Sequence, residues 1–215
     1  MVQAVLFDLD GTLLNTLPDI CKSVNEALKK FSYPPVTPEQ TKAYVGDGAR
    51  KLIERAVPAG AADTEACYEY FRTLFASSDN ALTFPYEGEI ALLKRLKAAN
   101  VKLGIVTNKP QDAALRAVKS RLPEVEFDFI GGDTGDFPCK PDPSLARYAA
   151  LTMRVFPEDC AFVGDGETDV KTARAAGMFS VACLWGYRTR EQLEQAGATR
   201  FARDFSQLGE LLFST

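Results

Sequence analysis

The sequence runs Val5-Leu6-Phe7-Asp8-Leu9-Asp10-Gly11-Thr12 near its beginning, an apolar segment that leads directly into two aspartates, a glycine and a threonine. The apolar segment predicts a buried β-strand, and side chains at i and i+2 of a strand point to the same side. A carboxylate at the end of a buried strand needs a cation or several hydrogen bonds, because desolvation is costly. The aspartates therefore suit a divalent metal with one carboxylate left free to react. An ordinary Asp-Gly turn is the simpler alternative.

Histidine is absent from the 215 residues. This absence excludes Ser-His-Asp hydrolysis, Cys-His proteolysis, histidine phosphotransfer and zinc sites built on histidine. Acid–base chemistry must then use carboxylates, lysine, tyrosine or cysteine. A metal would be held mainly by oxygen, which favours magnesium over softer transition metals.

The composition is that of an ordinary globular enzyme, with 46% hydrophobic and 25% charged residues. The net charge of −4 predicts no nucleic-acid partner. We expect no membrane span and no signal peptide, because the apolar runs are short and no basic segment precedes the first of them. The five cysteines form no CxxC pair and are odd in number, which favours free thiols and a cytoplasmic location.

Short apolar segments alternate with helical patterns along most of the chain. The predicted strands are residues 3–7, 102–106, 127–130, 161–163, 180–184 and 200–202. The predicted helices between and after them are residues 90–99, 112–121, 143–153, 167–176 and 205–213. Apolar strands separated by helices indicate a parallel sheet covered on both faces, so we predict a doubly wound α/β fold.

One region breaks the alternation, because residues 16–83 contain helical patterns and no convincing strand. Within it, Thr37-Pro38-Glu39-Gln40 has the pattern of a helix start. We therefore predict an α-helical domain over residues 16–83, inserted into a Rossmann-like core of residues 1–15 and 84–215.

Polar residues stand at the ends of the predicted strands. They are Asp8, the run Thr107-Asn108-Lys109-Pro110, Lys140 before the fourth strand, and the run Gly164-Asp165-Gly166-Glu167-Thr168-Asp169. The carboxyl ends of parallel strands share one edge of a sheet, where ligands bind. Each residue has a simpler interpretation alone, such as a helix cap for Thr107 or a solvated loop residue for Lys140. Together they predict one cleft that binds a phosphate and a magnesium ion.

These residues resemble the four motifs of the haloacid dehalogenase superfamily, specifically its magnesium-dependent phosphatases. The first motif, Asp-x-Asp-Gly-Thr, matches residues 8–12, the second matches Thr107, and the third matches Lys140. The fourth, Gly-Asp-x-x-x-Asp, matches residues 164–169. The helical insert resembles the cap domain of this superfamily, so the resemblance covers essentially the whole chain.

The resemblance implies the following roles. Asp8 is the nucleophile that forms an aspartyl phosphate, and Asp10 is the general acid and base. Mg²⁺ is the cofactor, held by the Asp8 carboxylate, the Asp10 backbone carbonyl and Asp165. Asp169 positions Lys140 or a metal-bound water. The phosphate-binding residues are Gly11, Thr107, Asn108 and Lys140, with Thr107 and Lys140 also counted as catalytic.

Within the superfamily the chain is most similar to phosphoglycolate phosphatases, which implies a small phosphorylated metabolite as substrate. The similar segments are residues 45–49, 106–110, 130–133 and 184–187. The cap residues implied in substrate choice are Gly46, Asp47, Gly48 and Arg50. The family often has Asn where this chain has Asp47, and a carboxylate there would repel a carboxylated substrate unless Arg50 or Lys51 compensates.

Several alternatives stay open at this point. A nucleotidase, a pyrophosphatase and a sugar-phosphate mutase belong to the same superfamily. A receiver-type signalling module also uses an acidic cluster, a threonine and a lysine, but its phosphorylated aspartate lies in mid-chain and its fold has no place for a cap. The sequence does not distinguish a monomer from a homodimer.

Overall fold

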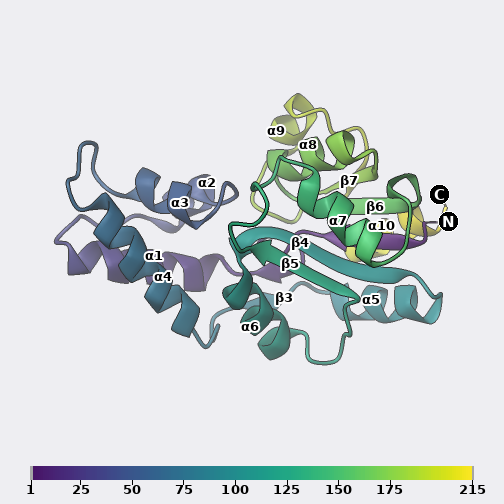
Figure 1. Cartoon of the computed structure of the whole chain (residues 1–215), viewed down its shortest axis with the longest axis horizontal. Helices are drawn as coiled ribbons and strands as arrows, with labels where there is room; N and C mark the ends of the chain where they lie inside the picture. Colours follow the sequence, from purple (N-terminus) through teal and green to yellow (C-terminus); the bar gives the residue numbers. More distant parts are fainter. Residues whose placement is uncertain (1, 215) are drawn as a thin grey trace.

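The computed structural model describes residues 2–214 and places a parallel sheet beside a separate group of four helices (Figure 1). The sheet has six strands in the order β5-β4-β1-β6-β7-β8, and all neighbours are parallel. Their bounds are β1 Ala4–Phe7, β4 Lys102–Pro110, β5 Phe129–Asp133, β6 Cys160–Gly164, β7 Phe179–Cys183 and β8 Phe201–Ala202.

Helices cover both faces of this sheet, because alternate side chains of each strand point to opposite sides. On β1, Val5 and Phe7 pack in the apolar cluster that includes α5 (Glu89–Ala98), α6 (Gln111–Arg121) and α10 (Phe205–Phe213). Ala4 and Leu6 pack in the cluster that includes α7 (Ser144–Thr152) and α8 (Glu167–Ala176). The predicted doubly wound α/β fold is confirmed.

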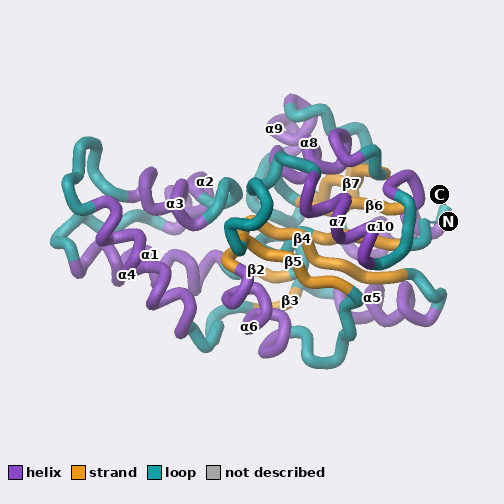
Figure 2. Tube along the Cα trace, in the orientation of Figure 1, coloured by secondary structure: helices purple, strands orange, loops and turns teal. Residues whose placement is uncertain are grey.

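The four remaining large helices form a separate apolar cluster beside the sheet, which we call the cap. They are α1 (Leu17–Lys30), α2 (Pro38–Tyr44), α3 (Ala49–Ala56) and α4 (Thr64–Ser77). The chain leaves and re-enters the core through a two-stranded antiparallel ribbon, β2 (Leu14–Asn15) with β3 (Phe84–Pro85) (Figure 2). The helix start predicted at Thr37 is present, because its hydroxyl and the Gln40 side chain form a reciprocal capping box.

The largest difference from the predicted elements concerns β4, which extends to Pro110 instead of ending at residue 106. Its polar residues Thr107, Asn108 and Lys109 are buried because other polar groups of the molecule pair with them. The ribbon strands β2 and β3 and the short helix α9 (Arg190–Gln195) were not predicted. Segments of two to six residues carry too little periodicity to be recognised.

None of the helices within residues 2–214 combines the length and the apolar character needed to cross a bilayer.

Glu89 at the start of α5 is buried, and neither of its carboxyl oxygens has a hydrogen-bond partner of good geometry. Burial raises the pKa of Glu89 to about 9 from an ordinary value of 4.5, and the Tyr86 backbone only partly offsets this. The folded state therefore holds a proton that the unfolded state releases above pH 4.5, so the free energy of unfolding falls as the pH rises from 4.5 to about 9.

Glu89→Gln should remove this pH-dependent loss, because glutamine does not ionise. As the pH rises from 4.5 to 7, we expect the free energy of unfolding of the variant to increase by on the order of 3 kcal/mol relative to that of the parent chain. Urea unfolding at several pH values measures the difference, and Glu26→Gln on an exposed face of α1 is the control. Parallel stability curves for Glu89→Gln and the parent chain would contradict a buried protonated carboxyl.

Candidate active site

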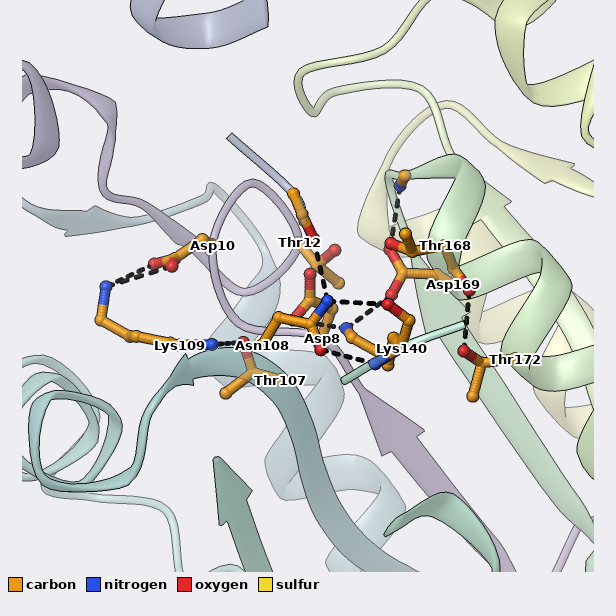
Figure 3. Close-up of polar contacts among 12 residues, drawn as sticks. Asp8, Asp10, Thr12, Thr107, Asn108, Lys109, Lys140, Thr168, Asp169 and Thr172 are labelled. Atoms are coloured by element: carbon orange, nitrogen blue, oxygen red, sulfur yellow. Dashed lines mark hydrogen bonds and ion pairs between the residues drawn. The ribbon is translucent and has the colours of Figure 1, made fainter. Parts of the chain in front are cut away.

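The carboxyl ends of β1, β4 and β6 bring the predicted polar residues together (Figure 3). Asp8 follows β1, and its N–H donates to the Val163 carbonyl of β6 at 2.9 Å, which holds Asp8 in line with the sheet. Asp165 follows β6 directly. Lys140 arrives from the loop between β5 and α7.

Lys140 is the buried cation of this cluster. Its Nζ lies 2.9 Å from Asp8 Oδ1 and 2.6 Å from Asp169 Oδ1. Burial alone would lower the pKa of Lys140, but the two carboxylates raise it above its ordinary value, so the ammonium stays charged. The Asn108 amide fixes the lysine backbone, because its Oδ1 accepts from the Lys140 N–H at 2.7 Å and its Nδ2 donates to the Lys140 carbonyl at 3.1 Å.

Asp165 is held from both sides. The Thr12 hydroxyl donates to Asp165 Oδ1, and the Tyr187 N–H donates to Asp165 Oδ2, each at 2.8 Å. Burial raises the pKa of Asp165 to about 7, and the neighbouring Asp169 and Asp8 add to this shift. Two glycines make room for the carboxyl, since a Cβ at Gly11 or at Gly186 would lie 2.4 or 2.2 Å from an atom of Asp165.

The arrangement of oxygen atoms fits a hard divalent cation. Asp8, Asp165 and Asp169 each offer a carboxylate oxygen, and the three oxygens lie within 4.8 Å of one another. Asp169 accepts from Lys140 and, at 2.9 Å, from the Gly166 N–H, whereas Asp8 Oδ1 pairs with Lys140 Nζ at 2.9 Å without a hydrogen bond of good geometry. The three carboxylates form an all-oxygen donor set of the kind that suits Mg²⁺.

The Asp10 side chain lies apart from this cluster and reaches Lys109 on β4 (Figure 3). Lys109 Nζ donates to both carboxylate oxygens of Asp10, at 2.8 and 3.1 Å. The same ammonium lies 4.3 Å from the centre of the Phe75 ring, which belongs to cap helix α4. The Asp10 carboxylate therefore faces the cap and not the cluster formed by Lys140 and the other aspartates.

Two small cavities open between the core and the cap, and Asp8 and Asp10 line both of them. The larger has a volume of about 50 Å³ and continues past Thr107 and Lys109 to apolar side chains of the cap. The smaller, of about 20 Å³, lies on the side of Asp165 and Asp169. A water molecule needs roughly 10–15 Å³ on this measure, so the closed arrangement accommodates only small groups.

The cap residues implied in substrate choice lie partly in the walls of these two cavities and partly outside them. Gly46 and Gly48 line the larger cavity, and Gly46 and Asp47 line the smaller one. Asp47 forms an ion pair with Arg55, which offsets the charge expected to repel a carboxylated substrate. Arg50 pairs with Glu65, with its side chain half exposed, and it is not among the described residues that line either cavity.

The sequence model of the haloacid dehalogenase-like hydrolases matches residues 5–183. The chain belongs to this family. Phosphoglycolate phosphatase 1 of Pseudomonas aeruginosa is 36% identical over 209 residues, covering 92% of this chain and 75% of the relative. The phosphoglycolate phosphatase of Rhodospirillum rubrum is 36% identical over 222 residues, covering 99% of this chain and 91% of the relative.

Solved structures of this family have the same fold. A protein of Lactobacillus delbrueckii subsp. bulgaricus predicted to be a phosphoglycolate phosphatase superposes with a TM-score of 0.91 at 27% identity, covering 99% of each chain. CbbY of Rhodobacter sphaeroides in complex with phosphate has a TM-score of 0.77 at 25% identity, covering 97% of each chain. The predicted family and the predicted enzyme class, a phosphoric monoester hydrolase, are confirmed.

Two of the residues predicted to bind phosphate have other partners in this structure. The Gly11 N–H donates to the Leu14 carbonyl at 2.8 Å. The Asn108 amide connects the Lys140 loop to the cap, where its Nδ2 also donates to the Gly46 carbonyl at 3.0 Å. Thr107 lines the larger cavity beside Asp8. Phosphate contacts by Gly11 and Asn108 stay predictions.

No role was predicted for Lys109 or Arg188, although both contact residues of the site or the cap. Arg188 pairs with Glu167 at 2.9 Å, and its guanidinium donates to the carbonyls of Lys42 and Val45 at the end of α2. This arginine therefore connects the fourth motif to the cap. The position of Lys109, two residues after Thr107 in a recognised segment, was the one available signal for its importance.

Proposed function

We propose that this family member is a magnesium-dependent phosphatase that hydrolyses a small phosphate monoester through an aspartyl phosphate on Asp8. The observation that carries this proposal is the position of the Asp8 carboxylate. It lies against the Lys140 ammonium, within reach of Asp165, and at the wall of both cavities. A phosphate placed there would meet a nucleophile and a fixed positive charge together.

In the first half of the reaction, a carboxylate oxygen of Asp8 attacks phosphorus as the ester P–O bond breaks, and protonated Asp10 gives its proton to the departing oxygen. In the second half, Asp10 takes a proton from water as that water attacks the phosphoryl group. Lys140 and the Thr107 hydroxyl stabilise the phosphoryl oxygens in both halves. Mg²⁺, when bound at Asp8 and Asp165, would neutralise phosphoryl charge and allow two anions to approach.

The substrate we propose is phosphoglycolate. The curated relatives described above are phosphoglycolate phosphatases, and the cavity of about 50 Å³ favours an ester with very few carbons. CbbY has been solved with xylulose bisphosphate, but its identity to this chain is only 25%. Closure of the cap over the substrate would exclude water from the first half of the reaction.

Turnover should require a divalent metal, because the carboxylates of Asp8 and Asp165 would otherwise repel an incoming phosphate. We expect chelation of the purified enzyme to lower hydrolysis of an aryl phosphate and of phosphoglycolate to background, and Mg²⁺ to restore both. A panel of phosphate esters, compared by kcat/KM with Mg²⁺ present, tests the substrate. Full turnover after verified metal removal would contradict the metal site, and a preference for nucleotides or sugar phosphates would contradict phosphoglycolate.

A further inference from the structure

A buried ammonium group in the wall of the larger cavity has no part in the mechanism above. It belongs to Lys109, which is the only basic residue among the described residues that line this cavity. Its side chain is 1% exposed, and its one anionic partner is Asp10. An ammonium has three N–H donors, so the two oxygens of Asp10 leave hydrogen-bonding capacity for another acceptor.

The surroundings of this ammonium are apolar on the cap side. The Phe75 ring lies 4.3 Å from Nζ and stacks on Phe71, with ring centroids 5.2 Å apart. Ile20, Val45 and Leu52 complete that wall of the cavity. Charge attraction is much stronger in such a place than in water, because little solvent screens it. A second anion entering the cavity would therefore be held mainly by Lys109.

We propose that Lys109 determines substrate specificity by binding the carboxylate of the substrate, a role that rests on the proposed phosphatase function. Asp8 and Lys109 line the same small cavity, so an ester that places its phosphate on Asp8 directs a short carboxylated arm toward Lys109. The ammonium then contacts the substrate carboxylate and Asp10 together. Lys109 thereby holds the substrate beside the acid that protonates its leaving oxygen.

Other cations near the site are already committed elsewhere. Lys140 lies between Asp8 and Asp169 and does not line the larger cavity. Arg50 pairs with Glu65 outside it. With the Asp8 carboxylate in the wall, a phosphate that also carries a carboxylate would meet repulsion without a cation on the cavity side.

Binding of an unreactive substrate analogue tests this role without depending on turnover. The probe is phosphonopropionate, in which a methylene replaces the bridging oxygen of phosphoglycolate, and its comparison is the same phosphonate with a neutral terminal amide. Calorimetry with Mg²⁺ present gives both affinities for the parent chain and for Lys109→Met. We expect the parent to bind the carboxylate about 10- to 100-fold more tightly than the amide, as for a hydrogen bond to a charged group.

Lys109→Met should reduce that ratio to about 1, chiefly because the ligand with the carboxylate binds more weakly. Lys109→Arg should keep most of it, because the positive charge remains. Lys94→Met, which removes an exposed lysine of α5, should behave as the parent chain. The ratio of the two affinities cancels any effect of the substitution on folding that weakens both ligands equally.

Three results would overturn the assignment. They are a ratio near 1 in the parent chain, a ratio that Lys109→Met leaves intact, and a ratio that Arg50→Met abolishes instead. Failure of the proposed phosphatase function is a separate result, since it is seen as absent hydrolysis of phosphoglycolate by the parent chain, whatever the binding ratio.

Discussion

Asp8→Asn is expected to lower turnover by roughly 10⁴-fold or more, while the variant folds normally. The amide is nearly the same size as the carboxylate, but it is a poor nucleophile and does not form an acyl phosphate. The variant keeps the N–H bond from residue 8 to Val163, so the end of β1 should stay in place. Steady-state hydrolysis of phosphoglycolate and of an aryl phosphate measures the loss.

Asp136→Asn is the matched control. Asp136 lies exposed in the loop after β5, so this substitution makes the same chemical change outside the site. Circular dichroism and urea unfolding should show that both variants are folded. A folded Asp8→Asn preparation that turns over at the parent rate, and in which mass spectrometry detects no reversion to aspartate, would mean that Asp8 is not the nucleophile.

Lys140→Met is expected to damage both stability and activity. The substitution leaves the carboxylates of Asp8 and Asp169 buried close together without their shared cation. Loss of one partner from a buried ion pair typically costs about 3–5 kcal/mol of unfolding free energy. Loss of a charge that stabilises the reacting phosphoryl group should lower kcat by roughly 10²- to 10³-fold.

Urea unfolding in the absence of metal measures the first effect, with the exposed Lys94→Met as control. Asp169→Asn added to Lys140→Met should recover part of the stability, because it removes one of the two unpaired charges. An equal loss of stability in Lys140→Met and Lys94→Met would contradict the account of a buried, charge-paired lysine.

The sequence predicted the fold well wherever strands are apolar and helices are long. The alternation of β1, β4, β6 and β7 with helices was readable because buried parallel strands are continuous apolar runs. The cap was recognisable because α1 and α4 carry apolar residues at helical spacing over 14 residues each. The division of the chain at residues 15/16 and 83/84 stays a prediction, close to the ribbon that joins the two parts.

The site was predictable in its members and less so in its contacts. The order of the strand ends indicated that Asp8, Lys140, Asp165 and Asp169 lie together, and they do. The pairing of carboxylates with lysines depends on the directions in which side chains leave the loops. The spacing of residues in the sequence does not predict these directions. The sequence therefore left open whether Asp169 positions Lys140 or a metal-bound water, whereas the structure shows the contact with Lys140.

The cap contacts were the least predictable part. Arg50 was predicted to act in substrate choice because it adds a positive charge at the start of the helix that follows residues 46–48. A helix, however, rotates each successive side chain by about 100°. That rotation places Arg50 with Glu65 on α4 and leaves the cap side of the larger cavity to Gly46, Gly48 and apolar residues. Lys109 was overlooked because a lysine after a strand end is usually solvated, and here the cap covers it.

The proposed mechanism requires Asp8 to carry the phosphoryl group during turnover, and trapping that group on the protein tests this requirement. In the proposed mechanism Asp10→Asn lacks the base for water attack, and a general base contributes about 10²- to 10⁴-fold. An aryl phosphate with a good leaving group needs little protonation, so Asp8 should still be phosphorylated and then persist in that form. The variant is mixed with this ester and Mg²⁺, quenched rapidly in acid, and weighed intact by mass spectrometry.

We predict a burst of about one product per active site and a protein heavier by one phosphoryl group, which disappears when Asp8 is also replaced by asparagine. A phosphorylated protein that persists when Asp8 is also replaced would contradict Asp8 as the carrier of the phosphoryl group. Steady turnover of the activated ester by Asp10→Asn at the parent rate, with no burst and no phosphorylated protein, would contradict the role of Asp10 as the base.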